Sequence, residues 1–109
     1  MRIARDATEL VGGTPLVQLN KVVGTNAHVY AKIEAFSPGF SVKDRIALQM
    51  GEEAERDGRL TRDTVIIEAT SGNTGIGLAW IAAIRGYRII ITMSARNSPE
   101  RIALLRALG

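Results

Sequence analysis

The 109-residue sequence predicts an α/β fold built on a parallel sheet. Residues 64–69 and 87–93 are runs of β-branched and apolar residues of strand length. Each run is followed by a segment of helical character, 73–85 and 99–108, and strands that alternate with helices form parallel sheets with right-handed crossovers. Because both runs are apolar almost throughout, we expect the two strands to be buried.

The first part of the chain predicts smaller elements. Residues 1–12 are consistent with a short helix or arm, and residues 12–15, Gly-Gly-Thr-Pro, mark a turn. Residues 16–19 and 28–34 have the composition of short strands that can pair as a hairpin, with a polar loop between them.

A helix is predicted between these two parts. Ser41 follows a Pro-Gly pair and is a good N-cap, and the helix is expected to run to about Asp57, with Gly58 as its stop. Gly51 lies inside this helix and costs helix propensity, which predicts close packing at that position.

The helix carries the first candidate functional residue, Lys43. Apolar residues recur on one face, in an arc of roughly 140°: Val42, Ile46, Ala47, Met50 and Ala54. Lys43 is predicted to lie in the middle of this arc, with Asp44 and Arg45 pointing away. Burial and the positive end of the helix dipole favour the neutral amine that a Schiff-base lysine needs. The alternative is a lysine that extends into solvent from a frayed helix start.

The second candidate site is the Gly-rich turn after the first parallel strand. Thr70, Ser71 and Thr74 offer hydroxyl groups, Gly72 offers a backbone N–H, and Asn73 offers an amide. Ligands of parallel sheets bind at the carboxyl ends of strands, and this donor set suits a carboxylate or phosphate. The alternative is that the hydroxyls only cap the following helix. The spacing of the glycines matches neither a dinucleotide-binding fingerprint nor a P-loop.

The composition excludes several function classes. The net charge of +3 comes from scattered basic residues, and five aromatic residues (two Tyr, two Phe, one Trp) offer little base stacking, so nucleic-acid binding is not predicted. The absence of cysteine excludes disulfides and thiolate metal sites, and a single histidine, His28, predicts no zinc site. Without a signal peptide or a membrane-length apolar run, the expectation is a soluble, cytoplasmic protein.

The two motifs together resemble those of the cysteine synthase (O-acetylserine sulfhydrylase) and cystathionine β-synthase family. The matching segments are 41–46, Ser-Val-Lys-Asp-Arg-Ile, and 70–75, Thr-Ser-Gly-Asn-Thr-Gly. Residues 13–16 and Glu100-Arg101 also stand at family-like positions. The resemblance implies a three-layer parallel-sheet fold of the tryptophan-synthase-β type, fold type II of the pyridoxal 5′-phosphate enzymes. Val42 before the lysine favours this branch over threonine synthases and dehydratases.

The resemblance also implies residue roles. Lys43 would form the Schiff base with pyridoxal 5′-phosphate and take the α-proton of the substrate. Asn73 would hydrogen-bond the cofactor's phenolic oxygen and contribute to substrate binding. Thr70, Ser71, Gly72 and Thr74 would hold the carboxylate of an amino-acid substrate. The implied reaction is β-replacement, which makes L-cysteine from O-acetylserine and sulfide in a homodimeric enzyme.

By the same resemblance, the chain is expected to be the N-terminal portion of a longer enzyme. Residues 1–38 would be an arm with hairpin strands, and residues 39–109 would be part of the smaller α/β domain. The family's phosphate site and its partner for the pyridine nitrogen would lie beyond Gly109, so the isolated chain is expected to be inactive. Ser37, Ala69 and the segment 93–98 depart from the family pattern, which leaves substrate preference open.

Three alternatives remain open. The first is β-replacement with homocysteine, as in cystathionine β-synthase. The second is a non-catalytic module that binds an anion or a partner protein, and the third is self-association through the apolar strand at 89–91.

Overall fold

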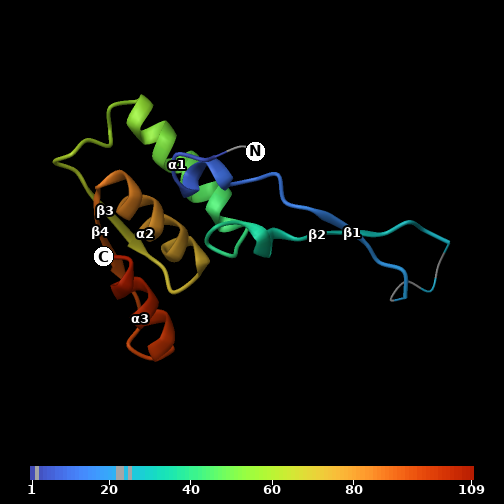
Figure 1. Cartoon of the computed structure of the whole chain (residues 1–109). Coiled ribbons are helices and arrows are strands. Elements are labelled where there is room, and N and C mark those ends of the chain that lie inside the picture. The colour runs from blue at the N-terminus through green and yellow to red at the C-terminus, as the bar shows by residue number, and fades with distance from the viewer. Residues whose placement is uncertain (2, 22–23, 25) are drawn as a thin grey trace.

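The computed structural model describes residues 1, 3–21, 24 and 26–109, which form short helices, a hairpin and an α/β unit (Figure 1). In chain order the elements are η1 (Ala7–Leu10), β1 (Leu16–Gln18), β2 (Tyr30–Lys32), η2 (Glu34–Phe36), α1 (Lys43–Arg56), β3 (Val65–Ala69), α2 (Asn73–Arg85), β4 (Arg88–Thr92) and α3 (Pro99–Ala107).

The parallel pair β3–β4 is the centre of the α/β unit. Its register runs from Val65 opposite Arg88 to Ala69 opposite Thr92, and α2 is the crossover between the two strands. The predicted α/β class with a parallel sheet is therefore confirmed, and the predicted bounds of β3, α2, β4 and α3 agree with the observed ones to within one residue.

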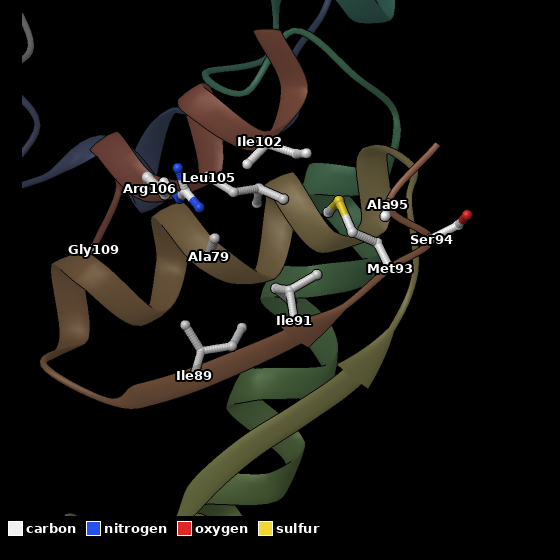
Figure 2. Close-up of a pocket in the computed structure, with 10 residues that line it drawn as sticks. All are labelled: Ala79, Ile89, Ile91, Met93, Ser94, Ala95, Ile102, Leu105, Arg106 and Gly109. Atoms are coloured by element: carbon white, nitrogen blue, oxygen red, sulfur yellow. The ribbon is translucent and has the colours of Figure 1, made fainter. Parts of the chain in front are cut away.

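The predicted burial of these strands is wrong. Ile67 and Ile90 are 67% and 52% exposed, whereas Ile89 and Ile91 are half-buried. Figure 2 shows Ile89 and Ile91 pointing into the space between β4, α2 and α3. One face of the pair is thus covered by helices, while Ile67 and Ile90 are exposed within the described part of the chain.

The predicted hairpin is confirmed. β1 and β2 pair antiparallel, with Val17 opposite Ala31, and backbone bonds from Leu19 to Val29 and from Ile33 to Pro15 extend the pairing. The hairpin projects from the helices as an arm (Figure 1). Residues 22, 23 and 25 of the expected polar loop lie outside the described residues.

The core lies where α1 packs against α2. Its buried members are Ala47, Leu78, Trp80 and Ile81. Close approach of the two helices depends on Gly77, since a Cβ there would lie 3.0 Å from the Cβ of Ala47. The expected close contact at Gly51 is absent, because a Cβ at that position would meet only Ile81, at 4.0 Å.

The predicted buried face of α1 is also wrong. Val42, Ile46 and Met50 are between 43% and 46% exposed, whereas Asp44, predicted to point outward, is fully buried with Ala47. The helix turns its small residue toward α2, and Asp44 can follow because hydrogen-bond donors meet its carboxyl group there. Lys43 is half-buried at the border of this face.

The helix ends follow the expected capping chemistry. Gly86 ends α2 in the left-handed region with φ of 75°, and the Ser98 hydroxyl accepts a hydrogen bond from the N–H of Arg101 at the start of α3. None of the helices in the described part of the chain has the length and apolar content that a membrane crossing requires.

Candidate functional site

Lys43 is the first residue of α1, and its backbone is held by the segment before it. Ser41 was expected as the N-cap; its hydroxyl accepts a hydrogen bond from the N–H of Lys43 at 3.2 Å, although Val42 occupies the N-cap position itself. The carbonyl of Ser41 also accepts from the N–H of Asp44 at 3.2 Å. The first turn of α1 is therefore anchored on both sides of the lysine.

Asp44, next to Lys43, joins three segments of the chain. Its Oδ2 accepts a hydrogen bond from the N–H of Gly39 at 2.5 Å, and its Oδ1 accepts one from Nε1 of Trp80 on α2 at 3.1 Å. Gly39 has to be glycine here, because a Cβ would lie 2.3 Å from Oδ1 of Asp44 and 2.7 Å from Nε1 of Trp80. The turn before α1, the first turn of α1 and α2 are thus connected through one carboxyl group.

The loop between β3 and α2 holds the second set of candidate residues. The Thr70 hydroxyl accepts a hydrogen bond from the N–H of Gly72 at 3.1 Å, and Gly72 is the N-cap of α2. No side chain of the described residues caps this helix start. The first backbone N–H groups of a helix have no partner within the helix, so the start of α2 suits a carboxylate. Ser71 and Asn73 are exposed.

Two contacts hold this loop in place. Nη1 of Arg101, on α3, donates a hydrogen bond to the carbonyl of Ser71 at 2.8 Å. A Cβ on Gly75 would lie 2.7 Å from Cγ2 of Thr70, so the loop and the first turn of α2 can pack this closely only with glycine at that position.

The structure brings the two motifs to the same end of α2. The carbonyl of Lys43 lies 3.2 Å from where a Cβ on Gly77 would stand, and Gly77 is one helical turn beyond Asn73. A cavity of about 360 Å³ lies beside Asn73 and the turn before α1, and neither Lys43 nor another residue of 41–46 lines it. It is lined by Pro38, Gly39, Phe40, Asn73, Ile76, Trp80, Leu104 and Leu108. Of the loop residues proposed from the sequence, only Asn73 lines this cavity; Thr70, Ser71, Gly72 and Thr74 do not.

A second cavity, of about 380 Å³, lies between α3, α2 and β4 (Figure 2). Its walls are mainly aliphatic side chains, with Arg106 at one side and Ser94 at the end of β4. None of the candidate residues of the two motifs lines it. The segment 93–98, which departs from the family pattern, contributes Met93, Ser94 and Ala95 to this cavity.

A polar network that the sequence pattern does not indicate joins Arg45 on α1 to Glu34 and Thr14. Arg45 donates to both carboxylate oxygens of Glu34, at 2.9 and 3.1 Å, and the Thr14 hydroxyl donates to Glu34 at 2.7 Å. The hydrogen bonds from Arg45, followed by that from Thr14, lower the pKa of Glu34 to about 2. Lys32 also donates to the carbonyl of Thr14. Since these residues are distant in sequence, no local spacing pattern could have indicated the network.

Comparison with known proteins finds relatives over most of the chain. A family model described as pyridoxal-phosphate dependent enzyme matches residues 7–109. A cysteine synthase of Staphylococcus aureus is 53% identical over 103 residues, which is 94% of this chain and 33% of that protein. A cystathionine beta-synthase of Saccharomyces cerevisiae is 54% identical over 106 residues, 93% of this chain and 21% of that protein.

A solved structure gives the same result. The crystal structure of a hydrogen sulfide-producing enzyme from Fusobacterium nucleatum matches with a TM-score of 0.95 and 51% identity, over 100% of this chain and 36% of that one. The chain therefore spans about a third or less of the length of these relatives.

Proposed function

The chain belongs to the family of pyridoxal-phosphate-dependent enzymes, and on that premise we propose that it carries the Schiff-base lysine and the substrate-carboxylate loop of a cysteine synthase. The fold type implied by the family resemblance is confirmed by the structural match at 51% identity. The observation that carries the proposal is the convergence of Lys43 and the residue 70–74 loop at one end of α2.

The residues present fit the cofactor. Lys43 offers a primary amine at the start of α1. The 360 Å³ cavity, which Lys43 does not line, combines the apolar walls of Ile76 and Trp80 with the amide of Asn73. A planar heteroaromatic ring with a phenolic oxygen requires such a combination of apolar surface and a few polar groups. We propose that Lys43 and Asn73 hold the cofactor.

The proposed mechanism assigns separate tasks to the two motifs. When bound, pyridoxal phosphate supplies an electron sink for negative charge at the substrate's α-carbon. Nζ of Lys43 anchors the cofactor and, once released, accepts the α-proton. Thr70, Ser71, Gly72, Asn73 and Thr74, with the start of α2, hold the substrate carboxylate. This orientation directs the α-proton toward the lysine.

The substrates follow from the relatives. The similarity to a cysteine synthase supports an activated serine, O-acetylserine, and sulfide as the substrates of β-replacement. A second candidate, homocysteine as the thiol, is supported by the similarity to a cystathionine beta-synthase. We propose a homodimer for the whole enzyme on the family resemblance. Because these 109 residues span a third of the cysteine synthase relative, we expect little or no turnover from them alone.

Trapping the cofactor on the lysine tests the proposal. An enzyme that contains this segment is incubated with pyridoxal phosphate, reduced with borohydride and mapped by peptide mass spectrometry. The lysines of the sequence are Lys21, Lys32 and Lys43, so Lys21, which is exposed, serves as an internal reference. The proposal expects labelling of Lys43 above that of Lys21. Equal labelling would overturn it and would favour a non-catalytic anion-binding module.

The thiol is identified separately. An enzyme that contains this segment is supplied with O-acetylserine and either sulfide or homocysteine, and the amino-acid products are analysed. Cysteine as the main product supports the first candidate, and cystathionine supports the second. In either case Lys43→Ala should abolish the reaction, whereas binding of an anion by a non-catalytic module would survive it.

A further inference from the structure

The buried carboxyl group of Asp44 is a feature that the proposed function does not use. It is fully buried, and each of its oxygens meets a different N–H donor, on Gly39 and on Trp80. Buried carboxyl groups are uncommon and are retained where their hydrogen bonds fix a specific arrangement. Because Asp44 directly follows Lys43, the arrangement that these hydrogen bonds fix includes the start of α1 at the lysine.

We propose that Asp44 and Trp80 are positioning residues for Lys43, an inference that rests on the proposed function. Consecutive helix residues are separated by about 100° around the axis. Once Asp44 is fixed against α2, the direction in which the Lys43 side chain leaves α1 is therefore fixed as well. The bond to Gly39 prevents the segment before the lysine from moving independently.

The same hydrogen bond fixes one wall of the cavity. Trp80 is 8% exposed, lines the 360 Å³ cavity beside Asn73, and donates its indole N–H to Asp44. An indole ring without this bond could change its tilt within the cavity. Asp44 thus fixes the start of α1, which carries Lys43, relative to Trp80 on α2.

Two substitutions separate positioning from general stability. Asp44→Asn keeps the size of the side chain but offers only one acceptor to two donors. Trp80→Phe keeps one aromatic ring, removes the Nε1 donor and shortens the buried bicyclic side chain. Glu53→Gln is the matched control, because it makes the same carboxylate-to-amide change on an exposed position of α1.

The measurement is the ratio of pyridoxyl labelling at Lys43 to that at Lys21, taken after trapping with borohydride under conditions where circular dichroism shows each variant to be folded. Asp44→Asn and Trp80→Phe are expected to lower this ratio by about three- to tenfold, the equilibrium effect of one lost hydrogen bond. Glu53→Gln should leave it unchanged.

The outcomes distinguish this inference from the proposed function. If Lys43 is labelled selectively in the natural sequence but the ratio is unchanged in both variants, Asp44 and Trp80 serve stability alone and the inference fails while the proposed function stands. If the natural sequence shows no selectivity for Lys43, both fail. Should Asp44→Asn not fold, Trp80→Phe decides, since it leaves the Asp44 carboxyl group and its bond to Gly39 in place.

Discussion

Nε1 of Trp80 donates a hydrogen bond of 3.1 Å to Oδ1 of Asp44 across the interface of α1 and α2. Both residues are buried, at 8% and 0% exposure, and they stand 36 positions apart in sequence. The bond joins the helix that carries Lys43 to the helix that begins at Asn73, so it connects the two motifs on which the proposed function depends.

Removal of this acceptor should destabilise the fold. Asp44→Ala leaves the N–H of Gly39 and the indole N–H of Trp80 without a partner in a buried site. Each unsatisfied donor costs about 1–3 kcal/mol, so we expect the free energy of unfolding to fall by about 2–5 kcal/mol. Urea denaturation followed by circular dichroism measures this loss.

The control for that experiment lies on the same helix. Glu53→Ala truncates an acidic side chain at an exposed position, where its only described hydrogen bond is with Gln49 one turn earlier. Surface changes of this kind usually alter stability by about 0.5 kcal/mol or less. Equal losses for the two variants would show that the buried carboxyl group contributes no more than a surface one.

The sequence allowed the order and class of the elements to be predicted, because these depend on local patterns. Runs of Val and Ile indicated β3 and β4, and Ser98 and Gly86 marked helix ends that the structure confirms. The orientation of α1 could not be predicted from local patterns. Hydrophobic periodicity placed Met50 inside and Asp44 outside, whereas the contact surface is decided by the smallness of Gly77 and by the donors on Gly39 and Trp80.

The candidate site was also predictable from the sequence only in part. Its residue types and spacing could be recognised in the linear sequence, and their roles stay predictions until they are tested. The ion pair between Glu34 and Arg45 could not be foreseen, because it joins η2 to α1 through the tertiary fold. Local spacing gives no information on such pairs.

The Glu34 network should make stability depend on pH. The pKa of Glu34 is lowered from 4.5 to about 2, mainly by its hydrogen bonds from Arg45. Between these two values the unfolded chain binds the proton more readily than the folded chain does. The stabilisation from Glu34 is thus fully present above about pH 4.5 and is lost as the pH falls toward 2.

This dependence is measured as a difference between variants. Free energies of unfolding are determined from pH 7 down to pH 3 for the natural sequence and for Glu34→Gln. The difference should be largest above pH 4.5 and should shrink as the pH falls. Glu100→Gln, on an exposed position at the start of α3, is the control. The pH-dependent stabilisation by Glu34 should persist in this variant. A difference in the free energy of unfolding that stays constant with pH would contradict the lowered pKa of Glu34.

The left-handed backbone at Phe40 predicts that glycine is more stable than alanine at this position. It has a φ of 59° although it is not glycine, and its side chain is 80% exposed. Its N–H donates to the carbonyl of Ser37 at 2.8 Å, closing the turn before α1. Left-handed backbone costs a residue with a Cβ about 1–2 kcal/mol.

The comparison that isolates this cost is Phe40→Gly against Phe40→Ala. Both variants lose the ring, and only the glycine variant relieves the backbone. We expect Phe40→Gly to be more stable than Phe40→Ala by about 1 kcal/mol, measured by thermal or urea unfolding. The same stability for the two variants would mean that the turn relaxes when the ring is removed.

Two glycines within helices should respond to alanine in opposite directions. Gly51 in α1 has room for a Cβ, which would meet only Ile81 at 4.0 Å, so Gly51→Ala should raise stability by up to about 1 kcal/mol through helix propensity. At Gly77 in α2, a Cβ would lie 3.0 Å from the Cβ of Ala47 and 3.2 Å from the carbonyl oxygen of Lys43. Both contacts involve the rigid body of α1, so Gly77→Ala has to push the helices apart. We expect it to lower stability by about 1–3 kcal/mol despite the better propensity of alanine. Urea denaturation of the two variants side by side measures both signs.

Because the displaced backbone is that of Lys43, Gly77→Ala should also lower trapping of pyridoxal phosphate on Lys43 relative to Lys21, whereas Gly51→Ala should leave this ratio unchanged. A stabilising Gly77→Ala would mean that the α1–α2 spacing adapts freely, and the placement of the lysine would then not depend on that glycine.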